Sequence, residues 1–251
     1  MSSISLVGLA FYAAVLLSAF TVRSAAGFGA GLIAIPMLAV ILPVSTAVSI
    51  ASVFTTLTSL QLVGREWRQI AWRQFIVIFS YSILGVGLGL YCMKLLNEDI
   101  LRHCLGIFLI LYSLYALLTP NTRHNDLVSR RWHRTLGAAV GIVGGFCSTL
   151  FGAGAGPIYV VYFNILRLER AVFRATMSAV VVLGGAARIA GYGSSGFYRS
   201  STTITLLAVG LPLVMVGSWL GDRLVFRLSA QSFSRLIAAI ILLSGVTLFV
   251  R

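Results

Sequence analysis

The sequence predicts an all-α integral membrane protein built from two repeats of about five hydrophobic segments each. Of its 251 residues, 59% are hydrophobic and only 10% are charged, and the mean hydropathy is +0.98. A soluble domain carries about 25% charged residues. Two further observations support this class: long apolar runs recur from end to end, and one glycine-rich motif occurs in both halves.

Ten apolar segments follow one another along the chain. No basic region precedes the first, so we expect a membrane segment there rather than a cleaved signal peptide. The second and seventh are shorter than the roughly twenty residues that a spanning helix needs, which predicts partial spans or re-entrant helices. The segments are Ile4–Val22, Gly31–Val44, Ala47–Val63, Phe75–Met93, Ile100–Leu118, Leu136–Phe151, Pro157–Leu166, Ala175–Tyr192, Ile204–Leu220 and Phe233–Val250.

A glycine-rich break comes before or at the start of each short segment. The breaks place glycine at every second position: Gly27, Gly29 and Gly31 in the first half, and Gly152, Gly154 and Gly156 in the second. An interrupted helix exposes N–H and C=O groups that can bind an anion, and paired interruptions are typical of transporter sites. Close helix packing through small residues is the alternative.

The two halves also match outside the breaks. Gly85–Gly89 aligns with Gly217–Gly221, and Ser52 aligns with Thr176. A duplicated five-segment unit explains these matches. We therefore expect one transmembrane transporter domain over residues 1–251, with repeat 1 at about 1–118, a linker loop at 119–134 and repeat 2 at about 135–251.

The distribution of basic residues predicts how often the chain crosses the membrane. If all ten segments cross, the nineteen Lys and Arg residues divide 14 to 5 between the two sides. If the short segments return to their own side, the division is 10 to 9. Basic residues accumulate in cytoplasmic loops, so ten crossings with both termini outside are favoured. Five crossings per repeat make the repeats inverted.

The net charge of +13 therefore has an explanation that involves no nucleic acid. No long basic tail is present to grip a nucleic-acid backbone. The expected partners are membrane lipid and a small anionic substrate, because arginines are abundant and acids scarce. The sequence leaves open whether the protein forms a homo-oligomer.

Two arginines are candidates for binding that substrate. Arg23 precedes the first break, with Ser24 after it; Ser148 and Thr149 occupy the corresponding positions in the second half. An arginine that extends to the cytoplasmic interface is the alternative for Arg23. Arg188 lies among small and apolar residues, and a charge at membrane depth is costly and thus often functional. An interfacial anchor is its alternative.

Hydroxyl side chains form a stripe along the third segment. Ser45, Ser49, Ser52, Thr56 and Ser59 follow the helical period, so they share one face. They could line an oxyanion path, or they could bond to their own helix or to a neighbour.

The sequence does not predict an enzyme, a metal site or a cofactor. The histidines and acids lie at segment edges, so no acid–base or nucleophilic set is expected within the membrane. Cys92, Cys104 and Cys147 have no CxxC spacing.

The two stretches GFGAGLIAIPML and GAGAGPIYVVYF resemble the glycine-rich repeat of the sulfite exporter TauE/SafE family. Arg68–Trp72 and the GxxxG-then-Leu endings of both halves are similar to that family too. Alanines replace some of the family's glycines at Ala30, Ala153 and Ala155, and serine replaces its usual threonine at Ser52. The resemblance implies a multi-pass permease of the inner (plasma) membrane that moves sulfite, sulfonates or related organic anions.

We therefore expect a secondary transporter that binds its anion between the repeats and works by alternating access. The binding residues expected are Arg23, Ser24, Gly27, Gly29, Gly31, Ser52, Ser148, Thr149, Gly152, Gly154, Gly156, Thr176 and Arg188. A passive anion channel and a non-transporting membrane assembly subunit are the alternatives.

Overall fold

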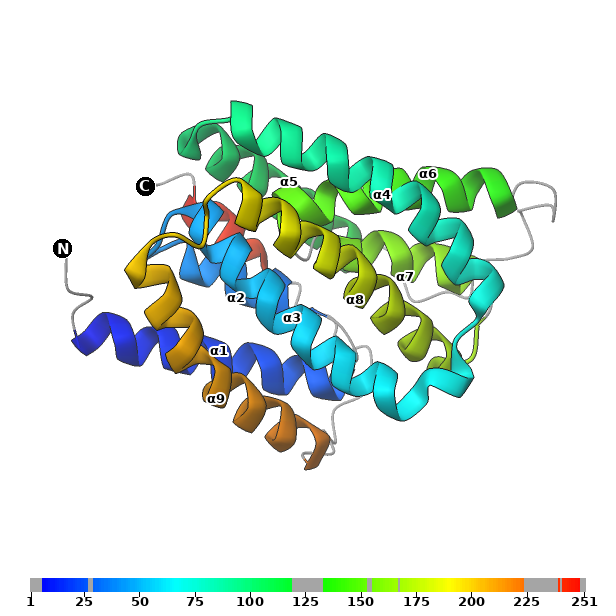
Figure 1. Ribbon diagram of the computed structural model, residues 1–251, viewed down its shortest axis with the longest axis horizontal. Helices are drawn as coiled ribbons and strands as arrows, with labels where there is room; N and C mark the ends of the chain where they lie inside the picture. Colours follow the sequence, from blue (N-terminus) through cyan, green and yellow to red (C-terminus); the bar gives the residue numbers. More distant parts are fainter. Residues whose placement is uncertain are drawn as a thin grey trace. The chain divides into compact units, whose positions relative to one another are not determined.

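The part of the chain that the computed structural model describes consists of helices joined by short connections, and no strand occurs in it (Figure 1). It comprises residues 6–26, 29–118, 133–152, 155–166, 168–223, 239 and 241–248. A 3-10 turn, η1, spans Trp67–Gln69, and residues 241–248 are helical too. The α-helices are α1 Leu6–Ala26, α2 Ala30–Leu38, α3 Val44–Glu66, α4 Trp72–Leu95, α5 Glu98–Leu118, α6 His133–Leu150, α7 Ala155–Ile165, α8 Arg170–Ser194 and α9 Ser201–Arg223.

These helices confirm the predicted all-α membrane class. Within the described residues, five helices are long and apolar enough to cross a bilayer. The second and seventh segments are short, as predicted: α2 has 9 residues and α7 has 11. At 1.5 Å per residue they reach about 14 and 17 Å, roughly half of a hydrocarbon core. The predicted linker at 119–134 lies almost wholly outside the described residues.

Both breaks contain a glycine whose backbone only glycine adopts readily. Gly29, which precedes α2, has φ 99°, and Gly152, which follows α6, has φ 67°. For other residues this left-handed conformation costs about 1–2 kcal/mol. Gly27 and Gly154 lie outside the described residues.

The chain forms two compact units, and each unit takes helices from both halves. The first comprises Met1–Ala51, Glu98–Pro120 and Phe197–Arg251, and the second comprises Ser52–Asn97 and Asn121–Gly196. Thus α9 of the second half packs with α1, and α4 of the first half packs with α6 (Figure 1). The units therefore do not coincide with the two sequence halves.

In the first unit, α1 and α9 approach through glycine. A Cβ added to Gly221 would lie 2.3 Å from the carbonyl oxygen of Thr21, so the two backbones are nearly in contact. The Thr21 hydroxyl donates to the Gly217 carbonyl at 3.0 Å, and the Tyr12 hydroxyl donates to the Leu206 carbonyl at 2.7 Å. Small residues allow this spacing, and the hydrogen bonds fix the register.

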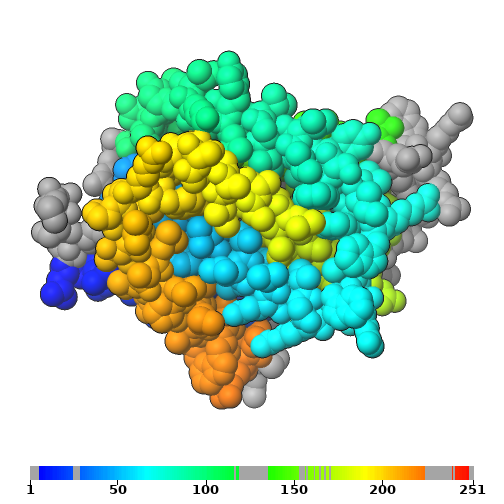
Figure 2. All heavy atoms as spheres, in the orientation of Figure 1, coloured from blue at the N-terminus to red at the C-terminus, as the bar shows by residue number. Residues whose placement is uncertain are grey.

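In the second unit, α4 and α6 approach in the same way. A Cβ on Gly85 would lie 2.0 Å from the Ile142 carbonyl oxygen, and one on Gly89 would lie 2.7 Å from the Thr149 Cβ. Helix α8 packs on the other side of α4, and Figure 2 shows the atoms of α4 and α8 side by side. There the Leu90 side chain occupies the space next to Gly191.

The close helix contacts α1–α9 and α4–α6, which we call the glycine seams, use corresponding positions. Gly85 and Gly217 correspond in the sequence alignment of the halves, and so do their partners Ile142 and Leu17. At the next turn, Gly89 meets Phe146 and Thr149, whereas Gly221 meets Thr21 and Ser24, their counterparts. The inverted orientation of the repeats in the membrane stays a prediction.

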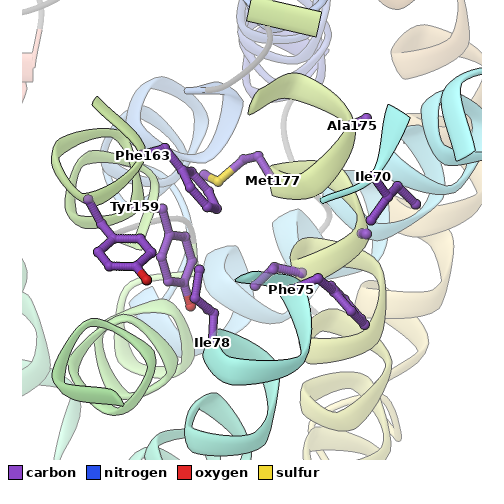
Figure 3. Close-up of a cluster of buried hydrophobic side chains, with 10 residues drawn as sticks. Ile70, Phe75, Ile78, Tyr159, Phe163, Ala175 and Met177 are labelled. Atoms are coloured by element: carbon purple, nitrogen blue, oxygen red, sulfur yellow. The ribbon is translucent and has the colours of Figure 1, made fainter. Parts of the chain in front are cut away.

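A cluster of apolar side chains packs α7 within the second unit (Figure 3). Phe163 of α7 lies against Met177 of α8, and Tyr159 lies near Ile78 of α4. Phe163 also makes an edge-to-face contact with Phe173 at 5.6 Å between ring centroids. This packing fixes the short helix next to α8 and determines where Tyr159 points.

Candidate functional site

Arg188 is the only buried charged side chain among the residues whose side chains are described. It lies on α8, is 4% exposed, and its Nε atom is fully enclosed. Burial of a guanidinium in a low-dielectric interior is costly, so such a residue in a membrane helix is a candidate for ligand binding. The structure thus places Arg188 at depth in its unit, as the sequence suggested, and not at an exposed edge.

Two tyrosines lie near this charge. The positive charge of Arg188 acts on the hydroxyls of both Tyr159 and Tyr192, so both lie near the guanidinium. Tyr192 follows Arg188 by four residues and therefore lies on the same face of α8. Tyr159 is 2% exposed and Tyr192 is fully buried. The hydroxyls of two buried tyrosines thus lie near the guanidinium.

Tyr192 connects three helices. Its hydroxyl donates a hydrogen bond of 2.5 Å to the carbonyl oxygen of Thr149, near the end of α6. A side-chain hydrogen bond also joins Tyr192 to Ser52 of α3. Ser52, Thr149 and Arg188, which the sequence proposed separately, are therefore brought together.

The position of Tyr159 depends on a glycine in α6. A Cβ on Gly144 would lie 2.6 Å from a carbon of the Tyr159 ring, so the ring occupies the space that a side chain would fill. The hydroxyl of Tyr159 lies 3.5 Å from the Ser82 Oγ of α4. This contact directs the phenol toward the interior of the unit.

The second glycine break adjoins this group of residues. Ser148 and Thr149 are buried in the last turn of α6, and their hydroxyls donate to the Gly145 carbonyl at 2.9 and 2.8 Å. Gly152 follows the end of α6, and Gly156 is buried in the first turn of α7. The break thus lies three residues beyond the carbonyl that Tyr192 holds.

The hydroxyl side chains of α3, those of the stripe included, bond partly to their own helix and partly to neighbours: Ser45 donates to the Glu98 carboxylate of α5. Thr56 and Thr55 donate to the Ser52 carbonyl at 2.7 and 3.2 Å, and Thr58 donates to the Phe54 carbonyl at 2.8 Å. Ser49 likewise donates to the Thr46 carbonyl at 2.9 Å. These contacts match the alternative of bonding to the same helix or to a neighbour, and Ser52 also reaches Tyr192.

Thr176 lies apart from Arg188. It precedes Arg188 by twelve residues, which is about 18 Å along a helix. Its Oγ1 accepts the N–H of Ala71 at 2.9 Å, and the ion pair of Arg174 with Glu66 lies close by in sequence. These contacts join the start of α8 to the connection between α3 and α4, which is a structural role.

The first break belongs to the other compact unit. Arg23 is partly buried in the last turn of α1, and the adjacent Ser24 hydroxyl donates to the Asp222 carboxylate of α9 at 2.5 Å. Gly29 precedes α2 and Gly31 is buried in its first turn. The predicted residues therefore fall into two groups, one in each unit.

Tyr159 and Tyr192 are candidate site residues that sequence reasoning missed. Tyr192 lies one helical turn after Arg188, and Tyr159 lies three residues after Gly156. The spacing of Tyr192 was a usable signal because residues four apart share a helix face. The spacing of Tyr159 gave none, since its ring is placed by Gly144 of another helix.

Comparison with known proteins agrees with this architecture. The family model described as sulfite exporter TauE/SafE matches residues 11–248. A probable inner membrane transporter protein of Comamonas testosteroni, TsaS, is 27% identical over 188 residues, covering 74% of this chain and 75% of that protein. No solved structure matches the chain significantly.

Two proteins of Bacillus subtilis are similar over longer stretches. The probable membrane transporter protein YunE is 27% identical, covering 83% of this chain and 84% of its own. The probable membrane transporter protein YjnA is 26% identical, covering 88% and 92%. Together with the family match over nearly the whole chain, these likenesses show that this multi-pass membrane protein belongs to the sulfite exporter TauE/SafE family.

Proposed function

We propose that this protein is a secondary transporter of small anions, in particular sulfite, sulfonates or related organic anions, and that Arg188 binds the anion. The observation that carries the proposal is a buried guanidinium beside a broken helix, with the hydroxyls of Tyr159 and Tyr192 nearby. Family membership supports the transport function, and the family name supports the substrate class.

The chemistry of Arg188 suits an oxyanion. A guanidinium stays charged at all physiological pH values and offers several N–H donors in a planar fork. Charge-assisted hydrogen bonds of this kind are about twice as strong as neutral ones. Ser52 and Tyr192 add hydroxyl groups to the same place. A sulfonate or sulfite presents several oxygens that can accept from the guanidinium donors.

Reconstitution of the purified protein in liposomes tests the proposal. We expect saturable uptake of radiolabelled sulfite, inhibited by unlabelled methanesulfonate and not by glucose or lysine. Liposomes without protein give the background. Flux that is absent for sulfite and for every sulfonate and carboxylate offered would contradict the proposed function.

A carrier differs from a passive anion channel in a way that the same liposomes reveal. Internal unlabelled sulfite should accelerate the uptake of labelled sulfite by a carrier, because exchange returns the loaded site. A channel would show no such acceleration and no saturation. A non-transporting assembly subunit would show no flux at all.

We also propose the inner (plasma) membrane as the location. The name of the Comamonas relative describes that protein as a probable inner membrane transporter. Fractionation of cells that express a tagged copy tests this, and recovery with outer-membrane markers would contradict it.

A further inference from the structure

We propose that the Arg188 site is selective for anions with a single negative charge and rejects dianions such as sulfate. This deepens the proposed function and rests on it. The inference comes from the charges that the second unit encloses, from the groups that surround Arg188, and from their burial.

The described charged side chains are distributed unevenly between the interior and the helix ends. Among the residues whose side chains are described, Arg188 is the one charged side chain that is buried. The described acids lie at helix ends: Glu66, Glu98, Asp99, Glu169 and Asp222. None of them is buried. Among the described side chains, the interior around Arg188 thus carries one positive charge, which can offset the charge of a bound anion.

The other polar groups described near Arg188 are neutral, and several already donate to backbone carbonyls. Tyr192 donates to the Thr149 carbonyl, and Thr149 and Ser148 donate to the Gly145 carbonyl. Such groups supply dipoles but no second full charge. A monoanion paired with Arg188 is electrically balanced, whereas a dianion leaves one charge without compensation.

Burial makes this imbalance costly. Arg188 is 4% exposed, Tyr159 is 2% exposed and Tyr192 is fully buried, so water screens the site weakly. Charges in a low-dielectric interior interact far more strongly than in water, and an uncompensated one is heavily penalised. We expect at least about 30-fold weaker competition by a dianion than by a monoanion of similar size.

Three anions test the proposal in liposomes that take up radiolabelled sulfite at pH 6. Methanesulfonate is a monoanion and sulfate a dianion throughout the range used, whereas sulfite loses its second proton as pH rises through neutrality. We expect methanesulfonate to compete equally at pH 6 and pH 8. Sulfate should need at least about 30-fold higher concentration. The apparent affinity for sulfite should fall as pH rises, because the hydrogensulfite form disappears.

Two variants sharpen the experiment. Arg188→Lys keeps the charge but loses the fork, so we expect weaker binding with the same preference for monoanions. Arg199→Gln removes an exposed arginine and should change neither affinity nor preference. Each purified variant is first checked for monodispersity and thermal stability, so that a folding defect is recognised.

The outcomes separate the two claims. Sulfate that competes as strongly as methanesulfonate, or sulfite affinity that rises with pH, would overturn the monoanion proposal and leave anion transport standing. Uptake of no anion at all would overturn the proposed function and the selectivity proposal together.

Discussion

At the scale of single residues, Tyr192 determines how the Arg188 helix meets the second glycine break. Its hydroxyl holds the Thr149 carbonyl at 2.5 Å from a fully buried position. The last turn of α6, just before the break, contributes the carbonyl, and α8 contributes both the tyrosine and the arginine. A change at this hydroxyl should therefore affect stability and anion binding at once.

We expect Tyr192→Phe to lower the stability of the purified protein by about 1–3 kcal/mol, because the Thr149 carbonyl loses its buried donor. Thermal unfolding in detergent measures this. The apparent KM for sulfite should rise while the maximal rate changes less, because Arg188 remains present. An unchanged KM together with a lower melting temperature would reduce Tyr192 to a purely structural residue.

Gly29 is a second residue whose effect follows from its conformation. A Cβ there meets nothing within 4 Å, so the left-handed φ of 99° alone determines the cost. We expect Gly29→Ala to destabilise by about 1–2 kcal/mol in thermal unfolding. Gly64→Ala is the matched control, since that helical glycine also has open space around it. Equal melting temperatures for the two variants would contradict the assigned backbone.

At the scale of elements, the glycine seams bring helices from different halves into contact. The matched pair Gly85 and Gly87 tests this within α4. A Cβ on Gly85 would lie 2.0 Å from the Ile142 carbonyl, whereas a Cβ on Gly87 meets nothing. We expect Gly85→Ala to cost about 1–3 kcal/mol through overpacking and Gly87→Ala to cost nothing, as seen in thermal unfolding.

The same comparison in the other unit uses Gly217, whose Cβ would lie 2.9 Å from the Leu17 carbonyl. A loss of stability after Gly217→Ala would show that both seams depend on glycine. Stability unchanged by both Gly85→Ala and Gly217→Ala would contradict the α4–α6 and α1–α9 packing.

Much of the position and length of the helices could be predicted from the sequence. Hydropathy located the helices, and segment length correctly predicted that α2 and α7 are short. The sequence alignment of the halves paired Gly85 with Gly217, and in the structure each of them lies in one of the two glycine seams. The helices that pack against those glycines could not be predicted. Hydropathy shows that a helix is apolar, but it does not say which neighbouring helix packs against it. Thr176 shows the same limit: its bond to Ala71 is made by tertiary packing alone.

At the scale of the whole molecule, the corresponding seams α1–α9 and α4–α6 suggest that the duplication extends to packing. The predicted ten crossings would make the two copies inverted, with most basic loops in the cytoplasm. The exposed residues Arg68 and Arg199 belong to loops on opposite sides in that scheme.

Cysteine labelling tests this topology. In a background without Cys92, Cys104 and Cys147, Arg68→Cys should react with an impermeant maleimide only after the cells are opened. Arg199→Cys should react in intact cells. Labelling of both from the same side would contradict ten crossings and the inverted arrangement.

The measurement that tests the central claim most directly is sulfite uptake by Arg188→Gln in proteoliposomes, beside Arg199→Gln as the matched control. Loss of the buried guanidinium removes the only buried charge described, so we expect the apparent affinity to fall by at least about tenfold. Arg199→Gln should transport as the unmodified protein does. Equal transport by both variants would contradict the assignment of Arg188 as the anion-binding residue.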